Sequence, residues 1–188
     1  MARTPAPGTR DTILTAAAGL FYEFGVRAVG MAQVVEAAGC GKNLLYKHFP
    51  SKAELAAAYL SLARRERERA VTEALRWSTD ATERLLALVG EIADSVRRPG
   101  YRGCAFRNYL TEFPGESDEP ARVAQAYLAD SRTQMDRLVA GAGGDELLAH
   151  RIWLVVNGLY SGTPADAPVA VDWITEMVRP PETPPAHN

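Results

Sequence analysis

Residues 30–52 read GMAQVVEAAGCGKNLLYKHFPSK, and this stretch decides the fold of the N-terminal part of the chain. Apolar residues recur at helical spacing over 31–38 and stop at Gly39, which predicts a short helix. A second short helix is expected over 42–48, after a glycine turn and before Pro50, because proline cannot continue a helix. Two short helices joined in this way are typical of a helix-turn-helix, whose second helix enters the major groove of DNA.

The sequence on either side of this stretch predicts two further helices. Upstream, residues 10–24 place apolar side chains on one face, and Gly25 follows as a stop signal. Downstream, Ser51 and Glu54 form a Ser-x-x-Glu capping box, in which each side chain satisfies an exposed backbone N–H. The run from there to about Trp77 is rich in Ala, Leu, Arg and Glu and contains no Gly or Pro. We expect one long helix that joins the two halves of the chain.

The remainder of the sequence also has the pattern of helices. Pro and Gly punctuate it, and no segment has the pattern of a strand. Helices are expected at about 80–98, 101–113, 119–140, 144–161 and 168–178. The fold class is therefore all-α. Residues 1–9 and the proline-rich residues 180–188 are expected to be disordered.

Composition excludes several classes of protein. Two cysteines and three histidines among 188 residues are too few for a disulfide framework or a four-ligand zinc site, so we expect no metal and no cofactor. The N-terminus lacks the apolar segment of a secretory signal, and the longest aliphatic-aromatic run, residues 152–156, is too short to span a membrane. These features predict a cytoplasmic protein with no membrane partner.

The net charge of −2 conceals an uneven distribution of charge. Residues 1–52 carry a formal charge of +3, whereas residues 53–188 carry −5. Within the basic part, cationic and hydrogen-bonding side chains gather over eleven positions: Lys42, Asn43, Tyr46, Lys47, His48 and Lys52. Such side chains can bind DNA phosphates and base edges. The alternative is an ordinary solvated helix face.

The segment 10–55 resembles the DNA-binding domain of TetR-type transcriptional regulators. The resemblance rests on Ile13-Leu14-x-x-Ala17, Leu20-Phe21-x-x-Phe24-Gly25, Val34, Ala37-Ala38-Gly39, Lys42, Leu45-Tyr46, His48-Phe49 and Ser51-Lys52-x-x-Leu55. It implies an N-terminal three-helix helix-turn-helix DNA-binding domain over residues 10–52. A C-terminal helical domain for effector binding and dimerisation would then occupy residues 53–179.

The resemblance also suggests roles for individual residues. Tyr46 and Lys52 would hold phosphates, while Lys42, Asn43, Lys47 and His48 would face the groove. Gln33, on the preceding helix, would reach the edge of the groove. Two positions depart from the family pattern: Gly41 stands where a Ser or Thr commonly caps the helix, and Leu44 where a small hydroxyl residue is common. Because Leu44 departs from the family pattern, the resemblance does not determine which operator sequence is recognised.

The helix expected near residues 147–160 is apolar on nearly every side, so it must be covered on every side. One reading is a dimer interface that it forms together with the last helix. The expected interface residues are Leu148, Ile152, Val155, Val156, Leu159, Trp173, Ile174 and Met177. The other reading is complete burial within one chain. The resemblance favours a homodimer and a palindromic operator.

Aromatic residues gather between about 60 and 160, the region where the resemblance places an effector pocket. The candidate ligand contacts are Trp77, Cys104, Phe106, Tyr109, Tyr127, Met135 and Trp153, which suggest a hydrophobic or aromatic small molecule. Cys104 lies between Arg102 and Arg107, whose charges would favour a reactive thiolate. Cys104 is therefore either an oxidant or electrophile sensor or an inert buried cysteine.

These features predict a ligand-responsive, sequence-specific transcriptional repressor that leaves its operator when a small molecule binds. An enzyme is not expected, because the sequence holds no recognisable catalytic set or phosphate-binding loop. The alternative is a helical ligand- or protein-binding module that retains the fold without recognising an operator.

Overall fold

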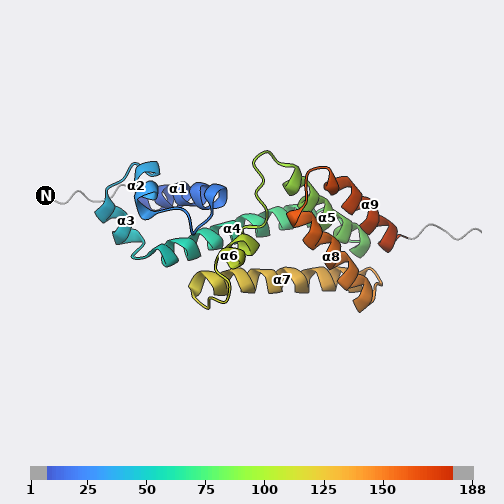
Figure 1. Cartoon of the computed structure of the whole chain (residues 1–188). Helices are drawn as coiled ribbons and strands as arrows, with labels where there is room; N and C mark the ends of the chain where they lie inside the picture. Colours follow the sequence, from blue (N-terminus) through green and yellow to red (C-terminus); the bar gives the residue numbers. More distant parts are fainter. Residues whose placement is uncertain (1–7, 180–188) are drawn as a thin grey trace, which may run out of the picture. The chain divides into compact units, whose positions relative to one another are not determined.

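The computed structural model describes residues 8–179, and within this range the chain forms nine helices and no strand (Figure 1). They are α1 (Thr9–Phe24), α2 (Met31–Ala37), α3 (Lys42–His48), α4 (Lys52–Leu75), α5 (Ala81–Arg97), α6 (Ala105–Glu112), α7 (Glu119–Gly141), α8 (Glu146–Ser161) and α9 (Asp166–Val178). The all-α prediction is confirmed. Of the two segments expected to be disordered, residues 1–7 and 180–188 lie outside the described range.

The expected helices agree with the observed ones within about two residues, except at the start of α6. This helix begins at Ala105 and not at Tyr101. Gly103 adopts a φ of +90°, a left-handed backbone conformation that a right-handed helix cannot contain. The first turn of the expected helix is therefore part of the loop that leads from α5 to α6.

The described helices divide into two compact units. The first contains residues 8–67 and 104–129, and the second contains residues 68–103 and 130–179. The helices α4 and α7 each contribute to both units. The first unit is thus larger than the expected domain over residues 10–52, because the first part of α4, α6 and the start of α7 share its hydrophobic core.

The core of the first unit joins residues that are far apart in the sequence. Ile13, Val34 and Leu45, from α1, α2 and α3, are fully buried in it, as is Leu60 of α4. Aromatic rings extend this core. The ring of Phe21 meets that of Tyr59 edge to face at 5.7 Å between centroids. Phe106 stacks on Tyr127 at 3.8 Å, which joins α6 to α7.

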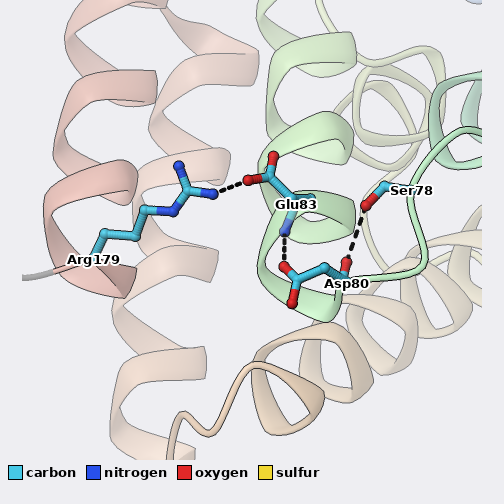
Figure 2. A network of polar contacts seen from close by, with 4 residues as sticks. All are labelled: Ser78, Asp80, Glu83 and Arg179. Atoms are coloured by element: carbon cyan, nitrogen blue, oxygen red, sulfur yellow. Dashed lines mark hydrogen bonds and ion pairs between the residues drawn. The ribbon is translucent and has the colours of Figure 1, made fainter.

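In the second unit α9 packs against both α5 and α8. A polar network ties the start of α5 to the end of α9 (Figure 2). The Asp80 carboxylate caps α5 by accepting the Glu83 N–H at 2.8 Å, and the Ser78 hydroxyl donates to the Asp80 carbonyl. The Glu83 carboxylate pairs with the Arg179 guanidinium just beyond α9. Both side chains of this ion pair are about half exposed, so it contributes at most about 1 kcal/mol.

Four of the residues expected at a dimer interface are core residues of the second unit. Ile152, Val156 and Leu159 of α8 and Ile174 of α9 have almost no exposed surface in a single chain. A side chain without exposed surface cannot be covered by a partner, so the expectation is corrected for these four. The other four expected residues keep exposed surface: Trp173 is exposed, and Leu148, Val155 and Met177 are half-buried.

Four exposed apolar residues of the second unit lie on α8 and α9. Leu147 and Leu154 of α8 are 57% and 60% exposed, and Val169 and Trp173 of α9 are 50% and 58% exposed. Because α8 and α9 pack against each other, these residues come from two neighbouring helices. We call these four residues the α8–α9 patch. Among the described residues, no helix combines the length and the apolar character that crossing a membrane requires.

Candidate nucleic-acid interface

Helix α3 is held in the first unit by its buried face. Helix α1 contacts both α2 and α3, and Leu45 projects from α3 into the core that contains Val34 of α2. The turn between α2 and α3 depends on Gly39, whose φ is +59°. Gly41 adopts extended backbone at the N-cap of α3 without a side-chain cap. The expected helix-turn-helix is present in the structure.

The opposite face of α3 carries polar side chains. Lys42, Asn43, Tyr46 and Lys47 are all exposed, and their spacing places them on one side of the helix. The Lys42 ammonium lies 5.9 Å from the centre of the Tyr46 ring. This surface combines two cations, an amide and a phenol, which are suited to phosphates and base edges.

Lys52, the first residue of α4, is tied to the loop between α1 and α2. Its Nζ donates to the carbonyl of Arg27 at 3.1 Å. Partial burial lowers the pKa of the Lys52 ammonium, the Glu112 carboxylate acts in the opposite direction, and the Arg27 charge lowers it further. An ammonium has three donors, so Lys52 keeps hydrogens available for a phosphate.

Gln33 and His48 have structural positions that the sequence analysis did not anticipate. Gln33 is exposed, but its Oε1 accepts the N–H of Gly30 at 2.7 Å and thereby caps α2. His48 is half-buried, and its Nε2 is buried without a hydrogen-bond partner among the described residues. The ring lines a cleft of about 300 Å³ in the first unit. His48 is therefore turned partly inward, whereas its role as a groove contact stays a prediction.

Sequence reasoning missed three residues of this region. Arg10, near the start of α1, lies over the ring of Phe49 at 4.8 Å, which places a cation beside the end of α3. Arg27 and Glu112 hydrogen-bond to each other across 85 residues of sequence. The basic charge of residues 1–52 was a signal for Arg10. No local sequence pattern predicts the contact between Arg27 and Glu112, because the two residues are so far apart in the sequence.

The expected ligand contacts fall into both units. Phe106, Tyr109 and Met135 are buried, and Tyr127 stacks on Phe106 in the first unit. The Tyr109 hydroxyl donates to Asp118 at 3.0 Å, and burial together with this bond raises the pKa of Tyr109.

The other three expected ligand contacts differ in exposure. Trp77 is 79% exposed on the surface, with the Arg76 guanidinium 4.0 Å above its ring, so it lines no enclosed cavity as placed. Cys104 is half-buried at the N-cap of α6. Trp153 is half-buried and lies 5.5 Å from the guanidinium of Arg132. The described residues contain no group of three or more potential metal ligands.

Comparison with known proteins places this helix-turn-helix in a family. The sequence model described as "Bacterial regulatory proteins, tetR family" matches residues 13–59, which contain α2, α3 and the turn between them. The HTH-type transcriptional activator FasR of Mycolicibacterium smegmatis is 33% identical over 162 residues, which cover 84% of this chain and 69% of that protein. The chain belongs to the TetR family.

Further relatives extend the similarity beyond the helix-turn-helix. An uncharacterised HTH-type regulator of Mycobacterium tuberculosis is 30% identical over 63% of this chain and 60% of its own length. A TetR-family transcriptional regulator from Streptomyces coelicolor has a TM-score of 0.85 at 26% identity, covering 91% of this chain and 94% of that one.

A TetR-type regulator from Streptomyces avermitilis has a TM-score of 0.73 at 27% identity, covering 90% and 96% of the two chains. TetR-family regulators bind DNA and typically act as dimers. Proteins of this family are transcriptional regulators and are generally not enzymes.

Proposed function

We propose that this TetR-family regulator binds an inverted-repeat operator as a homodimer, with α3 of each subunit in the major groove. The observation that carries the proposal is the exposure of Lys42, Asn43, Tyr46 and Lys47 on one face of α3. The buried face of the same helix anchors it through Leu45. A rigid helix with a polar outer face can read base edges without first ordering its backbone.

The contacts divide between positioning and sequence recognition. Tyr46 and Lys52 bind phosphates and fix the register of the protein on DNA, whereas Lys42, Asn43 and Lys47 contact base edges. Gln33 contributes from α2 through the amide nitrogen that its cap to Gly30 leaves available. Each phosphate contact lowers the slope of log K against log salt by about 0.9.

The α8–α9 patch is the dimer contact of this proposal. Exposed apolar side chains from two neighbouring helices are the kind of surface that a two-fold partner covers, because the same patch meets itself across the axis. Two-fold symmetry then requires two operator half-sites, one or more helical turns apart.

In this proposal the regulator acts as a repressor. A small hydrophobic or aromatic molecule binds to it and causes it to dissociate from the operator. Such release requires that the molecule bind the DNA-free conformation more tightly than the DNA-bound one. A second candidate is activation, because the relative with 33% identity is named a transcriptional activator.

Selection from a random double-stranded DNA pool at low and moderate salt tests the proposal. Enrichment of an inverted repeat that persists at moderate salt is the expected result. Binding that vanishes with salt for every sequence would contradict it and would favour a module that binds a protein instead. A reporter gene controlled by the enriched sequence then distinguishes repression from activation in cells with and without the regulator.

A further inference from the structure

Glu112, the last residue of α6, forms hydrogen bonds with the loop between α1 and α2. Its Oε2 accepts the backbone N–H of Arg27 at 2.6 Å. Its carbonyl accepts Nε of the Arg27 side chain at 3.0 Å and also accepts Nη2. The guanidinium lies 4.7 Å over the ring of Phe113. Arg27 is thus held at its backbone and at its side chain by two successive residues at the end of α6.

Arg27 also binds Lys52. The Arg27 carbonyl accepts Lys52 Nζ at 3.1 Å, while the Arg27 N–H is bound to Glu112. Both backbone polar groups of Arg27 are therefore engaged, one by α6 and one by the first residue of α4. The Glu112 carboxylate therefore restrains the same residue whose carbonyl accepts the Lys52 ammonium.

The loop approaches Glu112 closely at a second point. Gly25 has a φ of +85°, and a Cβ at this position would lie 2.9 Å from Glu112 Oε1. Only glycine permits both this backbone conformation and this approach. The contact of Glu112 with the loop therefore depends on Gly25 as well as on Arg27.

We propose that Glu112 is a positioning residue for DNA binding, which holds Arg27 so that the Lys52 ammonium is oriented toward a DNA phosphate. The inference rests on the proposed function and adds to it a residue outside the helix-turn-helix. A free lysine side chain loses rotamer freedom when it binds a phosphate. The hydrogen bond to Arg27 orders the ammonium beforehand and leaves two of its hydrogens for the phosphate.

A double-mutant cycle on the selected operator tests this role. Glu112→Ala is expected to weaken operator binding roughly tenfold at fixed salt, the loss typical of one charge-assisted hydrogen bond. Glu112→Gln is expected to lose less, because its amide oxygen can still accept the Arg27 N–H. In a Lys52→Ala background, Glu112→Ala is expected to have little further effect on affinity. Glu116→Ala, which removes an exposed carboxylate four residues further along, is the matched control.

Three results of this cycle would overturn the inference while leaving the proposed function intact. The first is a tenfold loss that persists in full in the Lys52→Ala background, since Glu112 would then act independently of Lys52. The second is an equal loss in Glu116→Ala. The third is tighter binding by both Glu112→Ala and Glu112→Gln, which would mean that the carboxylate only repels DNA.

Amide hydrogen exchange in the absence of DNA examines the contact itself. The Arg27 amide is expected to exchange faster in Glu112→Ala than in the wild-type protein, and an unchanged rate would overturn the inference alone. A wild-type protein that selects no DNA sequence would overturn the proposed function and the inference with it. Thermal unfolding of each variant identifies a loss of affinity that arises from unfolding.

Discussion

Gly25 lies against the carboxylate of Glu112, although 87 positions separate the two residues: a Cβ on residue 25 would be 2.9 Å from Oε1 and 3.0 Å from Oε2. Gly25 also ends α1 with a φ of +85°, a conformation that other residues adopt only with strain. The glycine that the sequence analysis treated as a helix stop is therefore also a contact point for α6.

Gly25→Ala is expected to lower the free energy of unfolding by about 1–3 kcal/mol, because the methyl group adds backbone strain and displaces the Glu112 carboxylate. Gly19→Ala is the matched control. Gly19 lies in α1 with open space around it, so alanine there is expected to raise the free energy of unfolding by about 0.5–1 kcal/mol. Urea unfolding of both variants checks this prediction, and an equal effect at the two positions would contradict it.

Substitutions on α3 and at the start of α4 should separate the two kinds of DNA contact. Lys42→Ala or Asn43→Ala is expected to change which operator is preferred, at a cost of about 1–3 kcal/mol for the original sequence. Tyr46→Ala or Lys52→Ala is expected to weaken binding to all sequences alike. Selection experiments repeated with each variant measure the difference.

Arg137→Ala, which removes an exposed cation of α7, serves as the charge control for these DNA-binding variants. It is expected to leave the preferred sequence unchanged. A similar loss for every sequence from Lys42→Ala, Asn43→Ala, Tyr46→Ala and Lys52→Ala would refute the division of roles.

Charged substitutions in α8 should have different effects on its two faces. Leu154→Glu is expected to leave a folded monomer, because Leu154 is 60% exposed and belongs to the α8–α9 patch. Ile152→Glu is expected to lower the melting temperature instead, because Ile152 is fully buried and an unpaired buried charge is costly. Sedimentation velocity and thermal unfolding distinguish the two effects.

Ala140→Glu introduces the same side chain at an exposed position of α7 and is the control for this pair. It is expected to change neither the melting temperature nor the association state. A dimer of unchanged affinity in Leu154→Glu would place the interface elsewhere.

Asp166 should make the stability of the second unit depend on pH in the acid range. Its carboxylate accepts the Thr163 N–H at 2.6 Å and the Thr163 hydroxyl at 2.7 Å, and these bonds lower its pKa below the ordinary value of 3.8. The folded state therefore favours the ionised form. The resulting stabilisation is fully present above the unfolded pKa and is lost as the pH falls through the folded one.

Asp166→Asn is consequently expected to melt below the wild-type protein at pH 6, and the gap should close as the pH falls below about 3.8. Asp172→Asn makes the same charge change on the same helix and is the control. Melting temperatures measured from pH 6 to pH 2.5 check this prediction. A gap that stays constant over this range would show that the Asp166 charge is not responsible.

The sequence determined the helices and which face of α3 is exposed and polar, because both depend on near neighbours. Pro50 ends α3, Gly39 turns the chain, and the spacing of Leu45 separates the buried face of α3 from Lys42 and Tyr46. One half of the predicted Ser51 capping box is present, because the Ser51 hydroxyl accepts the Glu54 N–H at 3.1 Å. The Glu54 carboxylate accepts a hydrogen bond from the Ser51 hydroxyl.

Only the tertiary structure decided which apolar residues are core and which are surface. A helix that is apolar on nearly every side has no pattern that selects its inner face, so Ile152 and Leu154 of α8 look alike in the sequence and differ completely in burial. The contact of Glu112 with Arg27 was equally hidden. It depends on a hydrogen bond to a backbone N–H, which every residue but proline carries, and the fold alone determines which N–H comes within reach of that carboxylate.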